Sequence, residues 1–530
     1  MMTPIDGLDQ IPSDDNKVGK LIREYAKWKT YRESWIQLWQ DCYEFAMPNR
    51  KGFYAEHPGQ ARTDRIFDST AVVSLQNFTS RIKSFVAPDF ARWASLQPGP
   101  EIPEQSRDDV ALALQDVEDF MFDTLQNSSN FDQEVALSLF DLAVGTGALI
   151  AEEGDAEEPI KWRTVPLTEL VLVGGPFGSI DGVFWPRQLR AKDVTSIWPK
   201  GKMSAPLQTD MKNNPERMLN FINVTLRNRN KRGTETWDHA IICLEHKDMI
   251  IEKTFKGEGS NPWIIFRWSP DDVYGRGPLL QALPDIKVAN LVVELILENA
   301  EMSITGMYQY GDDTVLNPHT IEFVAGTLIP VAENSRGIQP ITPPGRFDIS
   351  QIVLEDLQNK IRKALYDQPI GGLEQPVRSA TEIAERMAEF SRETGAPFAR
   401  LQKELAQPVI KRCAYILKKG GRISIPRLNG SEVRIFPVSP LGRAQEQQDI
   451  MNFDRFLEQV MARFGPEMVA QVVSPQRATK YLADKWTIPV DLLKSPAEVQ
   501  AEMQQVADAG MQAVEQGMDP EQLLKLAGAA

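Results

Sequence analysis

The sequence is poor in the residues that build metal centres and disulfide frameworks. Its 530 residues include only three cysteines, Cys42, Cys243 and Cys413, which are too far apart along the chain for a zinc motif or a disulfide framework. The four histidines show neither metal-ligand nor catalytic-triad spacing: His57, His239, His246 and His319. We therefore expect no metal site, and we expect the protein to be made in a reducing compartment.

Long apolar runs and an excess of basic residues are missing as well. No uninterrupted apolar run is long enough for a transmembrane helix, and no signal peptide is visible, so we expect a soluble protein without a membrane partner. The net charge is −15. Proteins that grip nucleic acid through its phosphates need clustered Lys and Arg, so this charge argues against such a grip. Nucleic acid that passes through without being held is compatible with it.

Glycine-rich phosphate loops are also missing. Gly145-Thr146-Gly147 and Gly174-Gly175 lack the Lys and Ser/Thr that follow in a Walker loop. The acidic pairs Asp271-Asp272 and Asp312-Asp313 lie in predicted turns, where Asp is common for conformational reasons. Nothing in the sequence selects a catalytic pair of carboxylates. We expect no cofactor and no catalytic residues, so the protein is not expected to be an enzyme.

The pattern of apolar residues predicts a mixed α+β chain with two to four subdomains, because 530 residues exceed what one core usually serves. After a loose arm at 1–16, helices are expected at residues 17–47, 68–85, 108–126, 131–144, 192–198, 348–366 and 379–419, and in the remainder to Ala530. Strands are expected at residues 148–151, 160–165, 170–173, 183–189, 219–226, 236–255 and 263–266, with a strand pair at 422–438. Ser379 to Glu382 form a capping box, and Gly395, Pro397 and Pro408 are expected to kink the helix that follows.

Two patterns have competing explanations. The helix at 17–47 carries an aromatic side, for which anchoring to the protein's own core is favoured over a ligand-stacking platform: Tyr25, Trp28, Trp35, Trp39 and Tyr43. The basic segment from Arg227 to Arg232 is interpreted as a solvated loop rather than a nucleic-acid patch.

The segment from Trp263 to Met302 organises the rest of the chain. A short apolar run predicts a buried strand, a glycine-containing turn follows, and Pro278 suits the first turn of a helix. Pro284 is expected to kink this helix or delay its start. On an otherwise aliphatic surface the helix carries one polar stripe at three- and four-residue steps: Lys287, Asn290, Glu294, Glu298 and Glu301. Such a helix is packed on most sides and shows carboxylates to water, and on the stripe alone an ordinary amphipathic helix is favoured.

Two further segments follow this helix. Residues 304–346 are expected to form a small β-rich insertion, with its clearest strand at 323–331. Residues 367–378 form a loop with Pro369, Gly371, Gly372 and Pro376, which keep the flanking helices from extending and leave the loop free to change shape. A pore gate with Ile370 and Leu373 at its constriction and a plain helix–helix connection both explain this loop.

Taken together, these pieces resemble the head-to-tail connector, or portal, proteins of short-tailed, T7-like bacteriophages. The resemblance covers about residues 20 to 505 and consists of motifs that are weak singly but specific in their order. These are Ala46-Met47-Pro48 after the aromatic helix, Asp68-Ser69-Thr70 opening a helix that ends near Pro88 and Trp93, Trp263–Arg267 leading into Tyr274-Gly275-Arg276-Gly277-Pro278, the loop before the Ser379 capping box, and Ile488-Pro489, Leu492-Leu493 and Ser495-Pro496-Ala497-Glu498.

The resemblance implies a portal fold with a mainly helical wing and crown, two stem helices lining a channel, and a small β-rich clip. The wing would be 17–277, the stem helices 278–303 and 347–366, the clip 304–346 and the tunnel loop 367–378. Residues 379–439 would hold the long kinked helix and the wing strand pair, and 440–530 the crown and C-terminal tail. The polar stripe would line the channel, and the resemblance favours a gate formed by Pro369, Ile370, Gly371, Gly372, Leu373 and Arg378.

The resemblance also implies partners and a location. It implies a homo-oligomeric ring of twelve subunits at one capsid vertex of the virion, assembled in the host cytoplasm, through which double-stranded DNA is packaged and ejected. Terminase and then a tail adaptor protein would dock on the clip, at Tyr310, Asp312, Asp313, Asn334 and Arg336, and the major capsid and scaffolding proteins would surround the ring. The alternative is an intracellular scaffold or adaptor oligomer without a DNA channel.

Overall fold

The computed structural model describes residues 17–54, 63–89, 92–103, 106–229, 235–305, 307–309, 339–341, 347–367, 395–437 and 453–463, with a few single positions up to residue 482. The predicted arm at 1–16, the Ser379 capping box and most of the predicted crown at 440–530 lie outside these residues. Helices and strands alternate in the described part, so the α+β class is confirmed.

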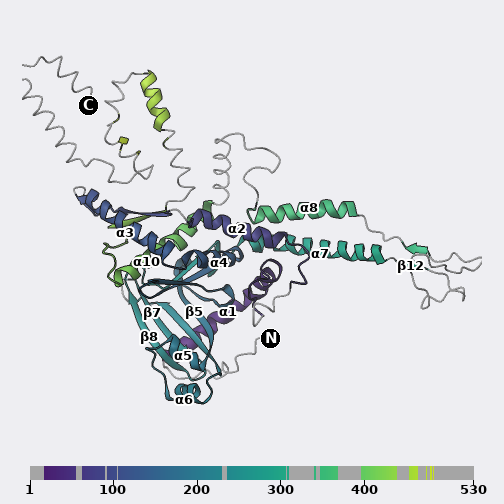
Figure 1. Ribbon diagram of the computed structural model, residues 1–530, viewed down its shortest axis with the longest axis horizontal. Helices are drawn as coiled ribbons and strands as arrows, with labels where there is room; N and C mark the ends of the chain where they lie inside the picture. The colour runs from purple at the N-terminus through teal and green to yellow at the C-terminus, as the bar shows by residue number, and fades with distance from the viewer. Residues whose placement is uncertain are drawn as a thin grey trace, which may run out of the picture.

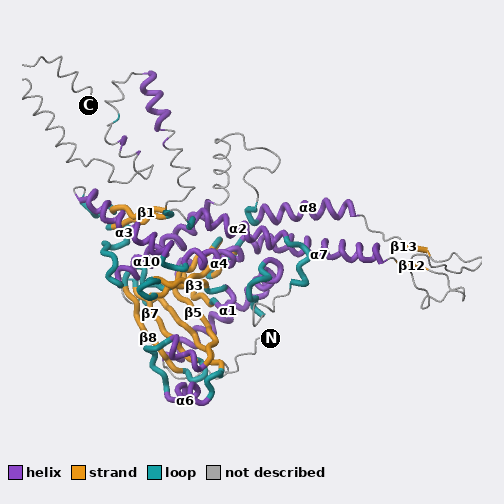
Figure 2. Tube along the Cα trace, in the orientation of Figure 1, coloured by secondary structure: helices purple, strands orange, loops and turns teal. Residues whose placement is uncertain are grey.

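Helices α2 (Thr70–Val86), α3 (Arg107–Asn127) and α4 (Phe131–Val144) form the upper layer of the body in Figure 1 and in the tube of Figure 2. Helix α1 (Lys17–Ala46) runs below them, beside the strands of the body. All four predicted helices are confirmed to within two residues at either end. The short helix expected at 192–198 is present as a 3-10 turn, Ala191–Asp193, followed by α5 (Val194–Ile197). Helix α6 (Ala205–Asn213) was not predicted and lies at the far tip of the sheet.

Two antiparallel sheets complete the body. The five-stranded sheet has the order β4-β5-β6-β7-β8 and consists of Val171–Gly174, Ile180–Arg190, Met218–Arg227, Thr236–Cys243 and Asp248–Lys256. The three-stranded sheet has the order β3-β2-β9 and consists of Ile160–Thr164, Thr146–Glu153 and Trp263–Arg267. The central strand β2 is buried along most of its length, which explains its continuous apolar sequence. A two-stranded turn, β10 (Ser269–Asp271) with β11 (Tyr274–Arg276), leads out of β9.

The prediction of a strand pair at 422–438 is wrong. Only β14 (Val433–Pro437) forms there, and it pairs antiparallel with β1 (Ala94–Pro98), a strand that was not predicted. The register joins Leu96 to Ile435 across more than 300 residues of chain. Two strands this far apart in the sequence are not joined by a hairpin turn, so no turn motif predicts their pairing. The prolines around residue 100 also predict a loop where β1 forms.

The aromatic side of α1 belongs to the core, as predicted. Trp39 and Tyr43 are buried, and the Trp39 ring meets Tyr274 edge-on at 4.9 Å between centroids. The Tyr274 hydroxyl accepts a hydrogen bond from the Leu172 backbone N–H at 3.0 Å, so β11 is fixed to β4. These rings therefore join α1, the β10–β11 turn and the five-stranded sheet, and they are not available to stack on a ligand.

The long helix after residue 394 is irregular just before Pro408, one of the predicted kink positions. A π-helical turn, Gln402–Ala406, precedes α10 (Gln407–Lys419), which holds Pro408 in its first turn. Because Pro408 has no N–H to bond back to the carbonyl of residue 404, the helical ladder widens just before it. Glu404 in this turn forms an ion pair with the buried Arg267 at 2.9 Å and ties the helix to β9.

Candidate functional site: the projecting helical arm

Two helices leave the body side by side and form an arm. They are α7 (Pro278–Thr305) and α8 (Phe347–Ala364), and Figure 1 shows them running together away from both sheets. Helix α7 starts at Pro278 as predicted, with Pro284 inside it. With a rise of about 1.5 Å per residue, α7 is about 40 Å long, so much of it extends beyond the body.

Close backbone contact fixes the start of the arm. At Gly275 and Gly277 a Cβ atom would lie 2.3 Å and 2.0 Å from the carbonyl oxygens of Gly145 and Ala143. The Gly277 N–H donates to the Val144 carbonyl at 2.8 Å, and the Gly275 N–H donates to the Thr146 hydroxyl at 2.9 Å. Only glycine allows this approach, which joins α7 to the end of α4 and the start of β2. The Tyr274–Pro278 motif thus aims the arm.

The residues before α2 hold the middle of α7. The Asn290 side-chain oxygen accepts hydrogen bonds from the backbone N–H groups of Phe67 (2.7 Å) and Asp68 (3.2 Å), and its amide donates to the Arg65 carbonyl at 2.9 Å. The Asp68 carboxylate in turn accepts hydrogen bonds from the N–H and hydroxyl of Thr70, the first residue of α2. The Asp68-Ser69-Thr70 motif therefore opens α2 beside the arm.

The residues of the predicted polar stripe lie in different environments. Asn290 is only 7 % exposed and spends its polar atoms within the subunit, so its assignment as a channel-lining residue is wrong. Lys287 forms an ion pair with Asp41 of α1 at 2.6 Å and lies over the Phe45 ring. Farther along the arm, Glu298 and Glu301 are exposed and Glu294 is half-buried. The stripe thus begins as an intramolecular seam and continues as an acidic surface.

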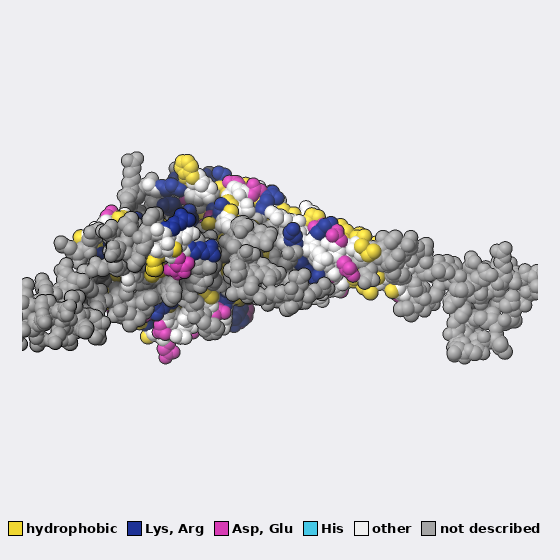
Figure 3. Space-filling view, turned by 90° about the horizontal axis from the view of Figure 1, so that it is seen from above, with side chains coloured by type: hydrophobic (Ala, Val, Ile, Leu, Met, Phe, Trp, Pro, Cys, Tyr) yellow, Lys and Arg dark blue, Asp and Glu magenta, His cyan; other side chains and the backbone are white. Residues whose placement is uncertain are grey.

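The arm also exposes apolar side chains that the subunit itself does not cover. On α7, Val288, Leu291, Leu295 and Leu297 are 47–53 % exposed, and on α8 Ile352 and Val353 are 70 % and 45 % exposed. Figure 3 shows hydrophobic side chains among Lys, Arg, Asp and Glu along this arm. On α8 the Lys360 ammonium pairs with the Asp356 carboxylate, and this contact raises the pKa of Lys360. The apolar residues at 288, 291 and 295 share one stripe, about 100° around the helix from the acidic stripe.

The body end of α8 is fixed by α2. The chain leaves α8 at Tyr366, which has a left-handed backbone (φ 55°) and packs on the Phe78 and Trp268 rings. Arg81 of α2 donates to the Tyr366 carbonyl, and the Asn77 amide donates to the Asp367 carboxylate at 2.8 Å. Helix α2 therefore holds α8, and the residues just before α2 hold α7.

The far end of the arm carries a short antiparallel pair, β12 (Met307–Gln309) and β13 (Gln339–Ile341), which closes the predicted β-rich insertion at its base (Figure 2). The insertion residues proposed for docking lie outside the described residues: Tyr310, Asp312, Asp313, Asn334 and Arg336. So does the strand expected at 323–331. The tunnel-loop residues also lie outside the described residues: Pro369, Ile370, Gly371, Gly372, Leu373 and Arg378.

The described residues contain no cluster of three or more side chains that could hold a metal ion. Among the same residues, no helix combines the length and the apolar composition that spanning a membrane requires. Cys42, Cys243 and Cys413 are free and buried, and burial raises the pKa of each thiol.

One surface feature escaped the sequence analysis. Arg227 and Arg229, from the segment interpreted as a solvated loop, line a cavity of about 920 Å³ together with Lys256, Lys411, Lys418 and Arg427. The six cations are scattered over 200 positions, so the charge run at 227–232 did not reveal the other four.

Comparisons with known proteins identify the family of this chain. A family described as bacteriophage head to tail connecting proteins matches residues 18–493. The chain belongs to this head-to-tail connector family. A protein of Bordetella phage BPP-1, described as a probable portal protein, is 20 % identical to this connector over 496 residues, covering 88 % of the connector and 85 % of the phage protein.

Two solved structures are also similar to the connector. A neck of an empty gene transfer agent particle, computed with C6 symmetry, shares 12 % identity at a TM-score of 0.39, covering 78 % of the connector and 90 % of that chain. A virion of a native gene transfer agent particle shares 14 % identity at a TM-score of 0.37, covering 78 % and 89 %. The family match and the phage relative confirm the resemblance to portal proteins found in the sequence.

Proposed function

We propose that this connector assembles into a closed ring of twelve subunits at one vertex of a phage capsid, with the arms side by side around a central channel. The ring would pass double-stranded DNA inward during packaging and outward during ejection, in the virion of a short-tailed phage, after assembly in the host cytoplasm. Membership of the connector family and the portal description of the phage relative support this proposal.

The observation that carries the proposal is the uncovered apolar surface of the arm. Six aliphatic side chains stand at least 45 % exposed on two helices that project from the body. Leaving such a surface in water is unfavourable, and contiguous exposed apolar surface marks an interaction site. Contacts between different faces of identical subunits close into a ring when the rotation allows it, so neighbouring arms are the natural cover.

The acidic continuation of the stripe supports a channel in which DNA slides. We assign Glu294, Glu298 and Glu301 to the channel wall, and we place Lys287 at its rim, beside Asp41. Repeated around a ring, these carboxylates would repel phosphates and would not grip them. The gate at residues 367–378 remains part of the proposal, with Gly371-Gly372 as its flexible centre and Ile370 and Leu373 at its constriction.

We also propose where the partners bind. The insertion beyond β12 and β13 is the proposed clip, where terminase would dock first and a tail adaptor afterwards. Its docking residues would be Tyr310, Asp312, Asp313, Asn334 and Arg336. The body would face the major capsid protein and the scaffolding protein, and residues 440–530 would form the crown inside the capsid and a C-terminal tail.

Electron microscopy of the purified protein, together with light scattering, tests the ring. We expect particles with an axial hole and a mass near twelve times the 59.6 kDa of one chain. A monomeric mass at micromolar protein and moderate salt would refute the proposal. Compact oligomers without a hole would favour the scaffold or adaptor alternative.

A further inference from the structure

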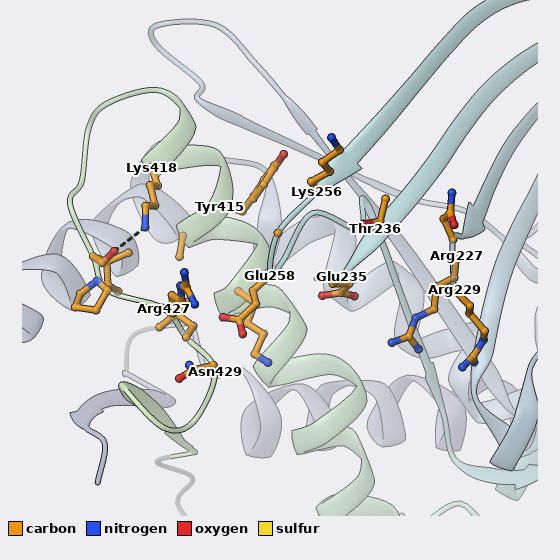
Figure 4. A pocket seen from close by; sticks show the side chains of 17 residues that line it. Arg227, Arg229, Glu235, Thr236, Lys256, Glu258, Tyr415, Lys418, Arg427 and Asn429 are labelled. Atoms are coloured by element: carbon orange, nitrogen blue, oxygen red, sulfur yellow. Dashed lines mark hydrogen bonds between the residues drawn. The ribbon is translucent and has the colours of Figure 1, made fainter. Parts of the chain in front are cut away.

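A basic groove lies on the body, away from the arm. It runs between the ends of β6 and β8, the face of α10 and the loop that leads into β14, as Figure 4 shows. Six cationic side chains line it, against two carboxylates, Glu235 and Glu258, in a chain whose net charge is −15. Its floor is apolar, because Ala414, Ile425 and Leu428 are buried there and the Tyr415 ring stands beside them.

Several of these cations have no counter-ion among the residues that the structure describes. Within the described residues, Arg227, Lys256 and Lys411 form no ion pair, and Arg427 has only a 4.0 Å contact to Glu432 while its side chain is 78 % exposed. Arg229 is paired with Asp181, and the Lys418 ammonium donates to the Ile425 carbonyl at 2.7 Å, the dashed line of Figure 4. The groove therefore presents a surplus of positive charge to an incoming group.

A buried arginine beneath the groove adds to that charge and shapes its wall. Arg412 donates hydrogen bonds to the carbonyls of Ala151 (2.9 Å), Gly259 (3.3 Å) and Ser260 (3.1 Å). Carbonyls satisfy its hydrogen bonds, and burial lowers its pKa to about 10. It thereby holds the loop after Lys256 against α10, and Tyr415 of the floor stacks on its guanidinium group at 5.3 Å.

The chemistry of the groove favours a peptide over nucleic acid. A nucleic-acid backbone presents phosphates at every step, so Glu235 and Glu258 in the lining would repel it, and an apolar floor would contribute nothing to phosphate contacts. A segment that alternates carboxylates with apolar side chains satisfies both the basic rim and the apolar floor.

This chain contains such a segment. Residues 497–530 hold six carboxylates and a single basic residue, Lys525, together with apolar side chains such as Val514, Leu523 and Leu524. The chain leaves the described body at Pro437, one five-residue strand after the groove-lining loop around Asn429. The 59 residues between 438 and 496 could span up to about 190 Å if extended, so reach does not limit the contact.

We propose that the acidic C-terminal segment of this chain, residues 497–530, docks in the basic groove formed by β6, β8, α10 and the loop before β14. The site is complete within one subunit, so the proposal does not rest on the ring or on the DNA channel. The segment would come from the same copy or from another copy in an assembly, and the charges and the apolar floor are satisfied in either case.

Photo-crosslinking in the full-length protein tests this docking. With p-benzoylphenylalanine incorporated at Asn429, irradiation is expected to join the groove to peptides from 497–530, identified by mass spectrometry. Reversing the rim with Lys256→Glu, Lys411→Glu and Arg427→Glu should lower the crosslink yield about fivefold or more, and so should raising the salt concentration, because exposed charges are screened. Electrophoretic mobility separates crosslinks within one copy from those between copies.

A charge swap and a matched control keep the test decisive. Adding Glu515→Lys, Asp519→Lys and Glu521→Lys to the reversed rim should restore the crosslink, which a misfolded variant could not do. Lys200→Glu, Lys202→Glu and Lys212→Glu, at the far tip around α6, change the net charge equally and should leave the yield unchanged. Crosslinks to other segments, no crosslinks, or a yield indifferent to the rim charges would overturn the proposal. Crosslinking of duplex DNA to the groove at low salt, without any crosslink to 497–530, would also overturn it and make the groove a nucleic-acid site.

Discussion

At the scale of single residues, a buried polar network around Asp141 holds the body. Asp141 of α4 is fully buried, accepts a hydrogen bond from the Tyr43 hydroxyl and contacts the Arg50 guanidinium at 2.8 Å. Burial raises the pKa of Asp141, and Arg50 and Tyr43 oppose that shift. The network joins the end of α1 to α4, whose C-terminus positions the start of the arm.

Removing the cation from this network should be costly. Arg50→Met leaves a buried carboxylate without its counter-charge, which costs about 3–5 kcal/mol in comparable buried pairs. We expect a fall of several degrees in the apparent melting temperature. Arg92→Met is the control, because its pair with Asp119 is about half exposed and should contribute about 0–1 kcal/mol. Equal effects of the two substitutions would show that the Arg50 contact is not special.

A half-buried histidine predicts a dependence of stability on pH. Burial, followed by Lys253 and Arg412, lowers the pKa of His239 to about 4, and its ring contacts the Thr225 hydroxyl at 3.0 Å. Between about pH 6.5 and pH 4 the unfolded chain binds a proton that the folded chain does not, so folding stability falls as the pH falls. His239→Gln keeps an acceptor for Thr225 and should flatten the melting temperature over this range. If the melting temperature of His239→Gln depended on pH like that of the parent protein, His239 would not cause this dependence.

At the scale of elements, the arm combines a fixed base with an uncovered outer half. If neighbouring subunits cover its apolar stripe, polar substitution there should weaken assembly and leave the subunit folded. We predict that Leu291→Ser with Leu295→Ser lowers the oligomer mass in light scattering without changing the far-ultraviolet circular dichroism. Met218→Ser, a comparably exposed residue on β6, serves as the control and should assemble normally. Full-size rings from the double variant would place the interface elsewhere.

The acidic part of the same helix makes a separate prediction. Glu294→Lys, Glu298→Lys and Glu301→Lys would turn repulsion of phosphates into contacts whose strength falls with salt, repeated in every subunit of a ring. We expect rings of normal mass that move DNA more slowly during packaging, most clearly at low salt. Packaging at the parental rate under those conditions would mean that the stripe does not face the channel.

At the scale of the whole molecule, the proposed gate can be separated from assembly. Gly371→Ala with Gly372→Ala would stiffen residues 367–378 by removing backbone freedom, without adding bulk to the ring. We expect unchanged oligomer mass and altered retention of DNA after packaging, measured by nuclease sensitivity of filled particles. A variant that packages, retains and releases DNA like its parent would leave the loop as a plain connection.

The sequence by itself determined the elements whose signals are local. The 3.6-residue periodicity of 131–144, the apolar run 263–266 and the glycines before Pro278 place helices and strands correctly, because side-chain period and turn chemistry act between neighbours in the chain. The order of such motifs also identified the family.

Only the tertiary structure decided which surfaces are free. Asn290 reads as one step of a stripe, yet it is buried against residues 65–68, more than 220 positions away. The pairing of β1 with β14 and the six cations of the groove likewise depend on contacts between distant segments. Burial and charge clustering are properties of the packed chain, and no local pattern encodes them.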